Sequence, residues 1–223
     1  MKIRIALYGT FVMLFAVSIS AYAQTPPDLV DTVISGTSQD VQTAISQGAD
    51  VNVRHADTGM TPLIAAAKYD IEIMSILVKA GADTSAHDTQ YGATALMWAA
   101  AYAKSPQVIV MLVKAGADME ALDNLGRTAL MFAAGMNQNP EVVAALLKAG
   151  ADIRTRNKDG GTALMAAAKG NMPQVVTALL EAGADVKVKD NIGNTALTYA
   201  RYNSQFGTAE GGTVLSRLEK ASQ

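Results

Sequence analysis

The sequence of 223 residues contains no cysteine and only two histidines, His55 and His87. Without cysteine the chain has no disulfide, no thiol nucleophile and no thiolate that could bind zinc. The histidines lie one unit apart in the repeat described below, both just before the tip of a hairpin, and no cluster of acidic residues completes a site around them. Packed helices lie roughly 8–10 Å apart, whereas the ligands of one zinc ion must reach to about 2 Å. We therefore expect no metal site and no other cofactor.

Aromatic and charged residues are also scarce, at 5% and 17% of the chain. Half of the residues are hydrophobic, mostly Ala, Val, Leu, Ile and Met. This composition favours closely packed helices over a β-sandwich, in which β-branched and aromatic residues dominate. The formal net charge is −2. Binding to nucleic acid would need a clustered basic excess, so we expect none.

The N-terminal segment, 1–23, differs from the rest of the chain. Lys2 and Arg4 precede an apolar run over residues 5–19, and the tripeptide Ala-Tyr-Ala ends at Ala23. A basic start, an apolar centre and an A-x-A end predict a secretory signal peptide over 1–23. An uncleaved N-terminal anchor is the alternative. After cleavage we expect no stable membrane insertion, because the uncharged run over 89–103 is shorter than the roughly 20 residues that a membrane-spanning helix needs.

Two short motifs recur through the remaining sequence. Gly-Ala-Asp recurs roughly every 34 residues, beginning at Gly48, Gly81, Gly116, Gly150 and Gly183. Thr-Pro/Ala-Leu recurs with the same period, beginning at Thr61, Thr94, Thr128, Thr162 and Thr195. Two markers with one common period indicate a stack of similar supersecondary units.

Each unit carries signals for two helices and a turn. The recurring threonine suits the N-cap of a first helix of small residues, as in "LIAAAK" and "LMFAAGM". A second apolar helix follows, with Lys79, Lys114 or Lys148 near its negative end, although Glu181 breaks this pattern. The glycine of Gly-Ala-Asp suits the left-handed end of that helix, and a turn glycine precedes the next threonine. The unit is therefore helix, helix and protruding hairpin.

The period and the segments "TPLIAAA", "LVKAGAD" and "LLKAGADI" resemble the ankyrin-repeat family over about residues 28–223. The resemblance implies an all-α solenoid of about six units, with capping repeats over 24–56 and 191–223 and four internal repeats over 57–190. In the last unit we expect a loop containing Gly207, Gly211 and Gly212 before the final helix.

One residue of the family pattern is missing. The family has a histidine after Thr-Pro-Leu that helps to tie neighbouring units by hydrogen bonding, and its absence predicts a weaker tie here. We expect methionine to fill the space by packing. The residues at the five equivalent positions are Ile64, Met97, Met131, Met165 and Thr198.

The recurring acids do not indicate catalysis. An acid that recurs at one position of every unit is suited to bonding the backbone of a turn rather than to acid–base chemistry. These acids are Asp50, Asp83, Asp118, Asp152 and Asp185. Gly160-Gly161 lacks the lysine and the spacing of a phosphate-binding loop. We therefore expect no enzyme and no catalytic residue.

Binding is the better-supported function, because an elongated stack exposes a concave face of hairpin tips and first helices. Four apolar residues lie beside turn glycines, namely Met60, Tyr91, Leu125 and Ile192. Others end the first helices and by resemblance face the ankyrin groove, namely Lys68, Tyr69, Tyr102, Met136 and Tyr202. Tyrosine is a preferred interface anchor, so Tyr69, Tyr91 and Tyr102 are the principal candidates. The alternative is that these tyrosines only cover the neighbouring unit.

Two further features concern the units' side chains. Basic residues of the last hairpins, including Arg127 as a candidate contact, interleave with acids, which indicates either a solvated mixed-charge face or a site for an acidic partner. These residues are Arg127, Arg154, Arg156, Lys158, Lys187 and Lys189. Trp98 is the counterpart of Ala65, Phe132, Ala166 and Tyr199 in the other units. We therefore expect Trp98 between units, in contact with Phe132.

Taken together, the sequence predicts an exported ankyrin-repeat protein that binds a partner protein as a monomer on its concave surface. The signal peptide favours the periplasm, with the extracellular space as the alternative. Two other roles fit the same features. One is a secreted effector or inhibitor that acts on a protein outside the cell, and the other is a stabilising accessory of an envelope enzyme.

Overall fold

The computed structural model describes residues 28–68, 71–170 and 172–223, so the predicted signal peptide and Tyr69 lie outside the described residues. The described chain forms six helix pairs, called units 1 to 6 below. They are α1 (Leu29–Ser35) with α2 (Ser38–Ser46), α3 (Pro62–Ala66) with α4 (Ile71–Lys79), α5 (Ala95–Tyr102) with α6 (Gln107–Lys114), α7 (Ala129–Met136) with α8 (Pro140–Ala149), α9 (Ala163–Gly170) with α10 (Pro173–Glu181), and α11 (Ala196–Arg201) with α12 (Ala209–Ser222). A short 3-10 helix, η1 (Ser204–Gly207), joins the last pair.

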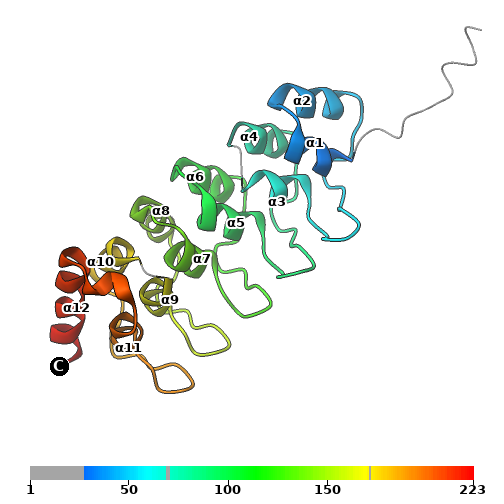
Figure 1. Cartoon of the computed structure of the whole chain (residues 1–223). Coiled ribbons are helices and arrows are strands. Elements are labelled where there is room, and N and C mark those ends of the chain that lie inside the picture. Colours follow the sequence, from blue (N-terminus) through cyan, green and yellow to red (C-terminus); the bar gives the residue numbers. More distant parts are fainter. Residues whose placement is uncertain (1–27, 69–70, 171) are drawn as a thin grey trace, which may run out of the picture.

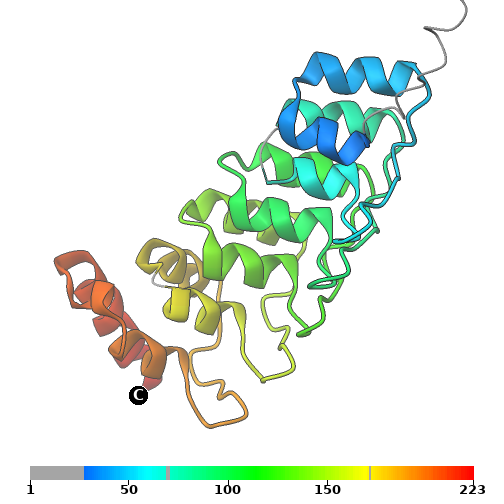
Figure 2. The same ribbon diagram turned by 45° about the vertical axis from the view of Figure 1, so that its right-hand side comes forward.

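The units stack in sequence order into an all-α solenoid. Each odd-numbered helix packs against the next odd-numbered one, so that α7 contacts both α5 and α9, while α8 contacts α6 and α10 in the second row. The loops between units, called fingers below, project from the side of the odd-numbered helices in both views (Figures 1 and 2). The described residues form no β-strand, only an isolated antiparallel bridge between His87 and Thr94.

The odd-numbered helices of units 2 to 5, α3, α5, α7 and α9, are largely buried because each lies between two units and the second row, whereas α1 and α11 at the ends are only partly buried. Every residue of α5 from Ala95 to Ala101 is buried. The small side chains of α5 let the neighbouring helices approach closely. The approach is closest between α7 and α9, where a Cβ added to Gly170 would collide with the carbonyl oxygen of Gly135. The even-numbered helices bury one face only. In α6 this face consists of Val108, Ile109 and Leu112.

The recurring threonines cap their helices at four of five positions. Thr61, Thr94, Thr162 and Thr195 each accept a hydrogen bond from the backbone N–H three residues on, at 3.3–3.4 Å. Thr128 departs from the expectation, because its hydroxyl makes no capping bond and is buried without a partner among the described residues. Its helix α7 nevertheless begins at the predicted residue.

The acids of Gly-Ala-Asp have the local role that their recurrence predicts. In each of the five motifs a carboxylate oxygen accepts a hydrogen bond from the backbone N–H two residues on, at 2.8–3.0 Å. The glycine of the same motif has a φ between +86° and +107° in all five units, the left-handed region that ends a helix.

Several hydrogen bonds tie the units where the family's histidine is missing. The Asn137 side chain donates hydrogen bonds to the carbonyl oxygens of Ala100 and Ala103, both at 2.9 Å, and so caps the C-terminal end of α5 in the preceding unit. Asn203 makes the equivalent bond to the carbonyl oxygen of Ala168 at 3.1 Å. Ile64, Met97, Met131 and Met165 are buried at the histidine position, as expected, and Thr198 completes a capping box with Thr195.

The fingers are joined to one another by their backbones. Each finger from unit 3 onward donates one backbone hydrogen bond to the finger before it, at 2.8–3.1 Å, from the N–H groups of Thr89, Asn124, Lys158 and Asn191. The turn glycines make this approach possible, since a Cβ on Gly92 would lie 2.5 Å from the Asn124 Oδ1 atom and one on Gly160 would lie 2.6 Å from the Asn191 Oδ1 atom. Gly193, in the last finger, would meet nothing within 4 Å.

The C-terminal cap differs from the prediction in one respect. The expected loop through Gly211 and Gly212 is wrong, because both glycines lie inside α12, which begins at Ala209. Thr208 is the reason: its hydroxyl accepts a hydrogen bond from the Gly211 N–H at 3.1 Å and so caps a helix that begins before the glycine pair. Phe206, buried to 1% exposure, closes the core beneath it.

Alanine substitutions at two turn glycines test the role of finger contact. Gly92 and Gly193 both have a positive φ, +68° and +87°, but only Gly92 faces a following finger. Gly193→Ala should lower the free energy of unfolding by about 1 kcal/mol, the penalty of a left-handed residue alone. Gly92→Ala should lower it by at least about 1 kcal/mol more, because a displaced finger adds to the backbone strain. Urea unfolding followed by circular dichroism measures both, and equal losses would contradict the account.

Candidate partner-binding surface

An aromatic cluster, defined by Tyr91, Trp98, Tyr102 and Phe132, lies between units 3 and 4. Trp98 is buried to 7% exposure, with its ring centroid 5.6 Å from that of Tyr91 and 5.9 Å from those of Tyr102 and Phe132. The predicted contact between Trp98 and Phe132 is therefore confirmed. The Lys68 Nζ atom lies 4.0 Å from the centroid of the Trp98 ring, which is a cation–π contact.

Tyr91 and Tyr102 both pack on Trp98 of their own unit and remain partly exposed. Tyr91 meets Trp98 edge-on and Tyr102 stacks on it with ring planes 10° apart, so both cover the neighbouring core. They also remain 41% and 47% exposed. Their packing holds the rings in place, which lowers the conformational entropy that a partner would have to remove on binding.

A buried acid fixes the orientation of Trp98. One oxygen of Asp88, 3% exposed, accepts a hydrogen bond from Trp98 Nε1 at 2.8 Å, and the other accepts from the Tyr91 backbone N–H at 2.6 Å. Asp190 repeats this arrangement in unit 6, where it accepts from the Tyr199 hydroxyl at 2.5 Å. Asp123 in unit 4 accepts instead from Arg127 Nε at 2.7 Å. The sequence pattern had not indicated that this second series of acids orients side chains of the following helix.

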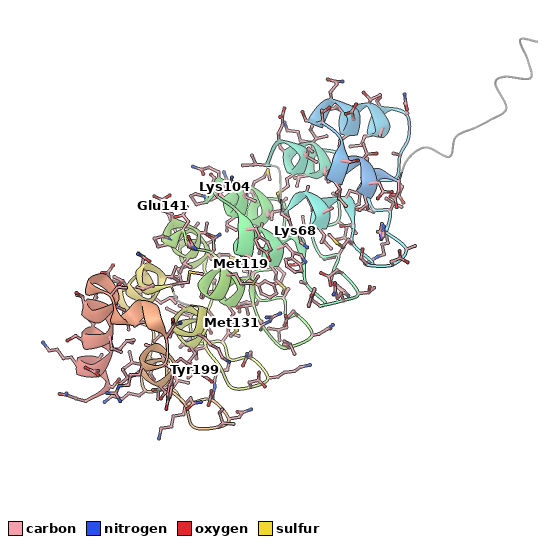
Figure 3. All side chains as sticks on the ribbon, viewed as in Figure 1. Lys68, Lys104, Met119, Met131, Glu141 and Tyr199 are labelled. Carbon is pink, nitrogen blue, oxygen red and sulfur yellow. The ribbon has the colours of Figure 1, made fainter. Side chains whose placement is uncertain are left out.

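A groove of about 420 Å³ lies beside the aromatic cluster, over units 4 to 6. Of the predicted residues, it is lined by Leu125, Arg127 and Met136. None of the other lining residues was predicted as a contact, and they include Phe132, Ala166, Lys169 and Tyr199. Phe132 belongs to both features, so the groove adjoins the aromatic cluster. Figure 3 shows Lys68, Met131 and Tyr199, which follow the row of inner helices along this face.

Charged side chains lie over two rings of this surface. Arg127 forms an ion pair with Asp123 at 2.7 Å and places its guanidinium carbon 4.5 Å from the Phe132 ring centroid. The Lys169 Nζ atom lies 4.8 Å from the Tyr199 ring centroid. The hydrogen bond from the Tyr199 hydroxyl is the main cause that lowers the pKa of Asp190, helped by backbone N–H groups and by Lys169.

Three predicted contact residues lie apart from this surface. Ile192 and Tyr202 are 81% and 88% exposed, and neither lines the groove. Met60 is half-buried and packs against the core rather than extending from its finger. Met60 follows its turn glycine, whereas Ile192 precedes Gly193, so the two residues are not equivalent and exposure depends on the side of the glycine.

Most basic side chains of the last fingers form hydrogen bonds or ion pairs with groups of the fingers themselves. Arg156 donates to the carbonyl oxygens of Gly160 and Lys189, at 3.0 and 2.6 Å. Lys158 Nζ donates to the carbonyl oxygen of Asn124 at 2.8 Å, and Arg154 pairs with an acid of its own turn. This distribution supports a solvated mixed-charge face rather than a site for an acidic partner.

The described residues show neither a metal site nor a membrane span. In that part of the chain, no three His, Asp or Glu side chains come close enough to hold one ion. His55 Nδ1 lies 3.2 Å from the Thr58 hydroxyl, within its own finger. No helix among residues 28–68, 71–170 and 172–223 is long and apolar enough to cross a bilayer.

Removing one hydroxyl tests the contact between Tyr199 and Asp190. Since the folded-state pKa of Asp190 lies below its unfolded value, the contact stabilises the protein above about pH 4, and this stability is lost as the pH falls through the folded pKa. Tyr199→Phe should raise the pKa of Asp190 toward its ordinary value and reduce the loss of stability on acidification. Carboxyl-carbon NMR titration measures the shift. Tyr202→Phe is the control and should leave Asp190 unchanged; an unchanged pKa in Tyr199→Phe would contradict the assignment.

The repeat architecture agrees with a comparison against protein families. The model described as ankyrin repeats (3 copies) matches residues 29–123, 100–190 and 130–210. These overlapping matches extend from α1 to the start of α12 and cover most of the chain. Ankyrin repeats are typical modules of protein–protein interaction, and the family is generally non-enzymatic. The chain belongs to the ankyrin-repeat family.

Proposed function

We propose that this chain is an exported, non-enzymatic protein that binds a partner protein across the aromatic cluster and the adjoining groove. The observation that carries the proposal is a pair of exposed tyrosines, Tyr91 and Tyr102, packed on the buried Trp98. Aromatic side chains held by a rigid base supply contact area at low entropic cost, and they are common among the strongest contacts of interfaces.

The surface beside the tyrosines has the composition of an interface core. Leu125 and Met136 are 52% and 41% exposed, and they lie at the groove. Scattered single apolar residues are ordinary on a protein surface, but these four side chains belong to the aromatic cluster or to the groove that adjoins it. The face is therefore suited to bury apolar area against a partner.

The charged rim favours selectivity over strong attraction. Arg127 and Lys169 border the apolar surface, and Asp159 and Asp190 line the same groove. Mixed charges at a rim discourage partners with mismatched charge, and they add little affinity at physiological salt. Affinity would therefore come chiefly from the aromatic and apolar side chains.

The compartment follows from the N-terminal segment. A basic start, an apolar run and an A-x-A end over residues 1–23 support export, and the absence of cysteine is compatible with an oxidising compartment. We place the protein in the periplasm, as a monomer, with the extracellular medium as the other destination to test by cell fractionation. Recovery from the culture medium alone would contradict the periplasmic assignment.

A double alanine variant tests the binding surface. Tyr91→Ala/Tyr102→Ala should weaken capture of the partner at least about tenfold, because each truncated interface anchor costs on the order of 1–2 kcal/mol. The bait is the full chain with its own N-terminal segment, and capture is measured after crosslinking in the producing cell. The helical circular dichroism signal should be unchanged, since both side chains are partly exposed.

Tyr202→Ala is the matched control, because Tyr202 is exposed and lies outside the groove. It should bind within about twofold of the unmodified protein. A photo-crosslinking residue at position 102 should capture the partner, whereas the same residue at Val110, 43% exposed on α6, should not. Equal capture from both positions, or full binding by the double variant, would overturn the proposed surface.

A further inference from the structure

One ring is missing from the row of rings on the concave face. Trp98, Phe132 and Tyr199 occupy one equivalent position in units 3, 4 and 6, and unit 5 has Ala166 there. Ala166 is half-buried and lines the groove, between the Phe132 and Tyr199 units. Ala65 holds the same position in unit 2 but is fully buried at 0% exposure. Only unit 5, among the units with alanine here, leaves open space in place of the ring.

The surroundings of this space match those of the rings in the other units. Each ring of the row has a cation over it, at 4.0 Å for Trp98, 4.5 Å for Phe132 and 4.8 Å for Tyr199. The cations beside the last two rings, Arg127 and Lys169, also line the groove. An aromatic ring inserted above Ala166 would therefore lie among two rings and two cations, an environment that favours aromatic over aliphatic side chains.

The finger of unit 5 departs from the repeat as well. Asn157 stands where units 3, 4 and 6 have Asp88, Asp123 and Asp190. Its Oδ1 atom accepts hydrogen bonds from the backbone N–H groups of Asp159 and Gly161, at 3.1 and 2.7 Å. These two bonds identify the remaining atom, Nδ2, as the amide nitrogen. Within the described part of the chain Nδ2 has no hydrogen-bond partner, and Asn157 lines the groove.

The two departures are complementary. In units 3 and 6 the acid accepts a hydrogen bond from the polar atom of its own ring, Trp98 Nε1 or the Tyr199 hydroxyl. In unit 5 both partners have changed, so that an N–H donor replaces the carboxylate oxygen and the ring is absent. The ring that would complete this unit must carry a hydrogen-bond acceptor, and of the side chains of Phe, Trp and Tyr only tyrosine has one.

We propose that the groove at Ala166 is a socket for a tyrosine side chain of the partner protein, with its hydroxyl accepting a hydrogen bond from Asn157 Nδ2. This inference rests on the proposed function and names the chemistry of the contact. The volume of about 420 Å³ accommodates a phenol ring together with neighbouring backbone atoms. Asp159 and Asp190 balance the charges of Arg127 and Lys169 in the same groove, so the lining is suited to a neutral phenol rather than to a carboxylate or a phosphorylated tyrosine.

Small probes test the socket without a partner. p-Cresol, toluene and phenyl phosphate are titrated into the full chain while the backbone amide signals of Gly135, Gly161 and Gly170 are followed by NMR. p-Cresol should shift them saturably, with a dissociation constant on the order of 1 mM. Toluene should bind at least threefold more weakly, and phenyl phosphate more weakly still. Absence of saturable shifts, or equal binding of toluene, would overturn the proposal.

Two variants locate the probe. Ala166→Tyr fills the socket with a ring of the chain itself, as in unit 6. This variant should lower the affinity for p-cresol at least tenfold. Asn157→Asp restores the acid found in the other units, so the finger should fold as they do. This variant should bind p-cresol with unchanged affinity, because the p-cresol hydroxyl can donate a hydrogen bond to the new carboxylate. Its affinity for 4-methylanisole, whose oxygen can only accept a hydrogen bond, should fall at least fivefold. Unchanged p-cresol binding by Ala166→Tyr, or unchanged 4-methylanisole binding by Asn157→Asp, would contradict the assignment.

Failure of the socket and failure of the proposed function give different results. If crosslinking from position 102 captures a partner and Ala166→Tyr captures it equally well, the socket is wrong and the binding surface stands. If p-cresol binds as described but no partner depends on Tyr91 and Tyr102, the proposed function is wrong and the socket is a site for free phenols.

Discussion

The close approach of successive units is the constraint on which the rest of the structure depends. No helix pair of this chain can bury its apolar face alone, so each pair is stable only when it packs against its neighbours in the stack. Small residues in the inner helices and glycines at the finger turns allow that approach. A Cβ at Gly170 or Gly92 would already meet the neighbouring unit. Because the approach is close, the fingers also exchange backbone hydrogen bonds, and the concave face is held by main-chain as well as side-chain contacts.

This constraint explains why functional features appear as departures from the repeat. A residue that recurs in every unit, such as the acid of Gly-Ala-Asp, serves the unit itself by bonding its turn. A residue that changes in one unit alters the surface that the unit presents. Trp98 brings two exposed tyrosines together in unit 3, while Ala166 and Asn157 open a groove in unit 5. The two departures lie on either side of Phe132, in the aromatic cluster and in the groove that adjoins it.

The sequence predicted those features that depend on residues recurring at fixed offsets. The helix pairs, the role of the recurring acids and the contact of Trp98 with Phe132 are all of this kind. It did not predict that Thr128 lacks a capping bond or that α12 includes Gly211, because both depend on local geometry. Asp88 could have been found, since an Asp or Asn precedes four successive turn glycines by three or four residues. The groove could not, because Ala65 and Ala166 are equivalent in sequence and differ only in what covers them.

The central claim is that the fingers form one connected ladder that holds the concave surface in place before a partner binds. Hydrogen exchange of four backbone amides, those of Thr89, Asn124, Lys158 and Asn191, tests it directly, because each donates to the preceding finger. The account predicts that all four are protected and exchange only through opening of the stacked units. Exchange of these amides at the rate of an unstructured peptide, while the inner helices stay protected, would contradict it.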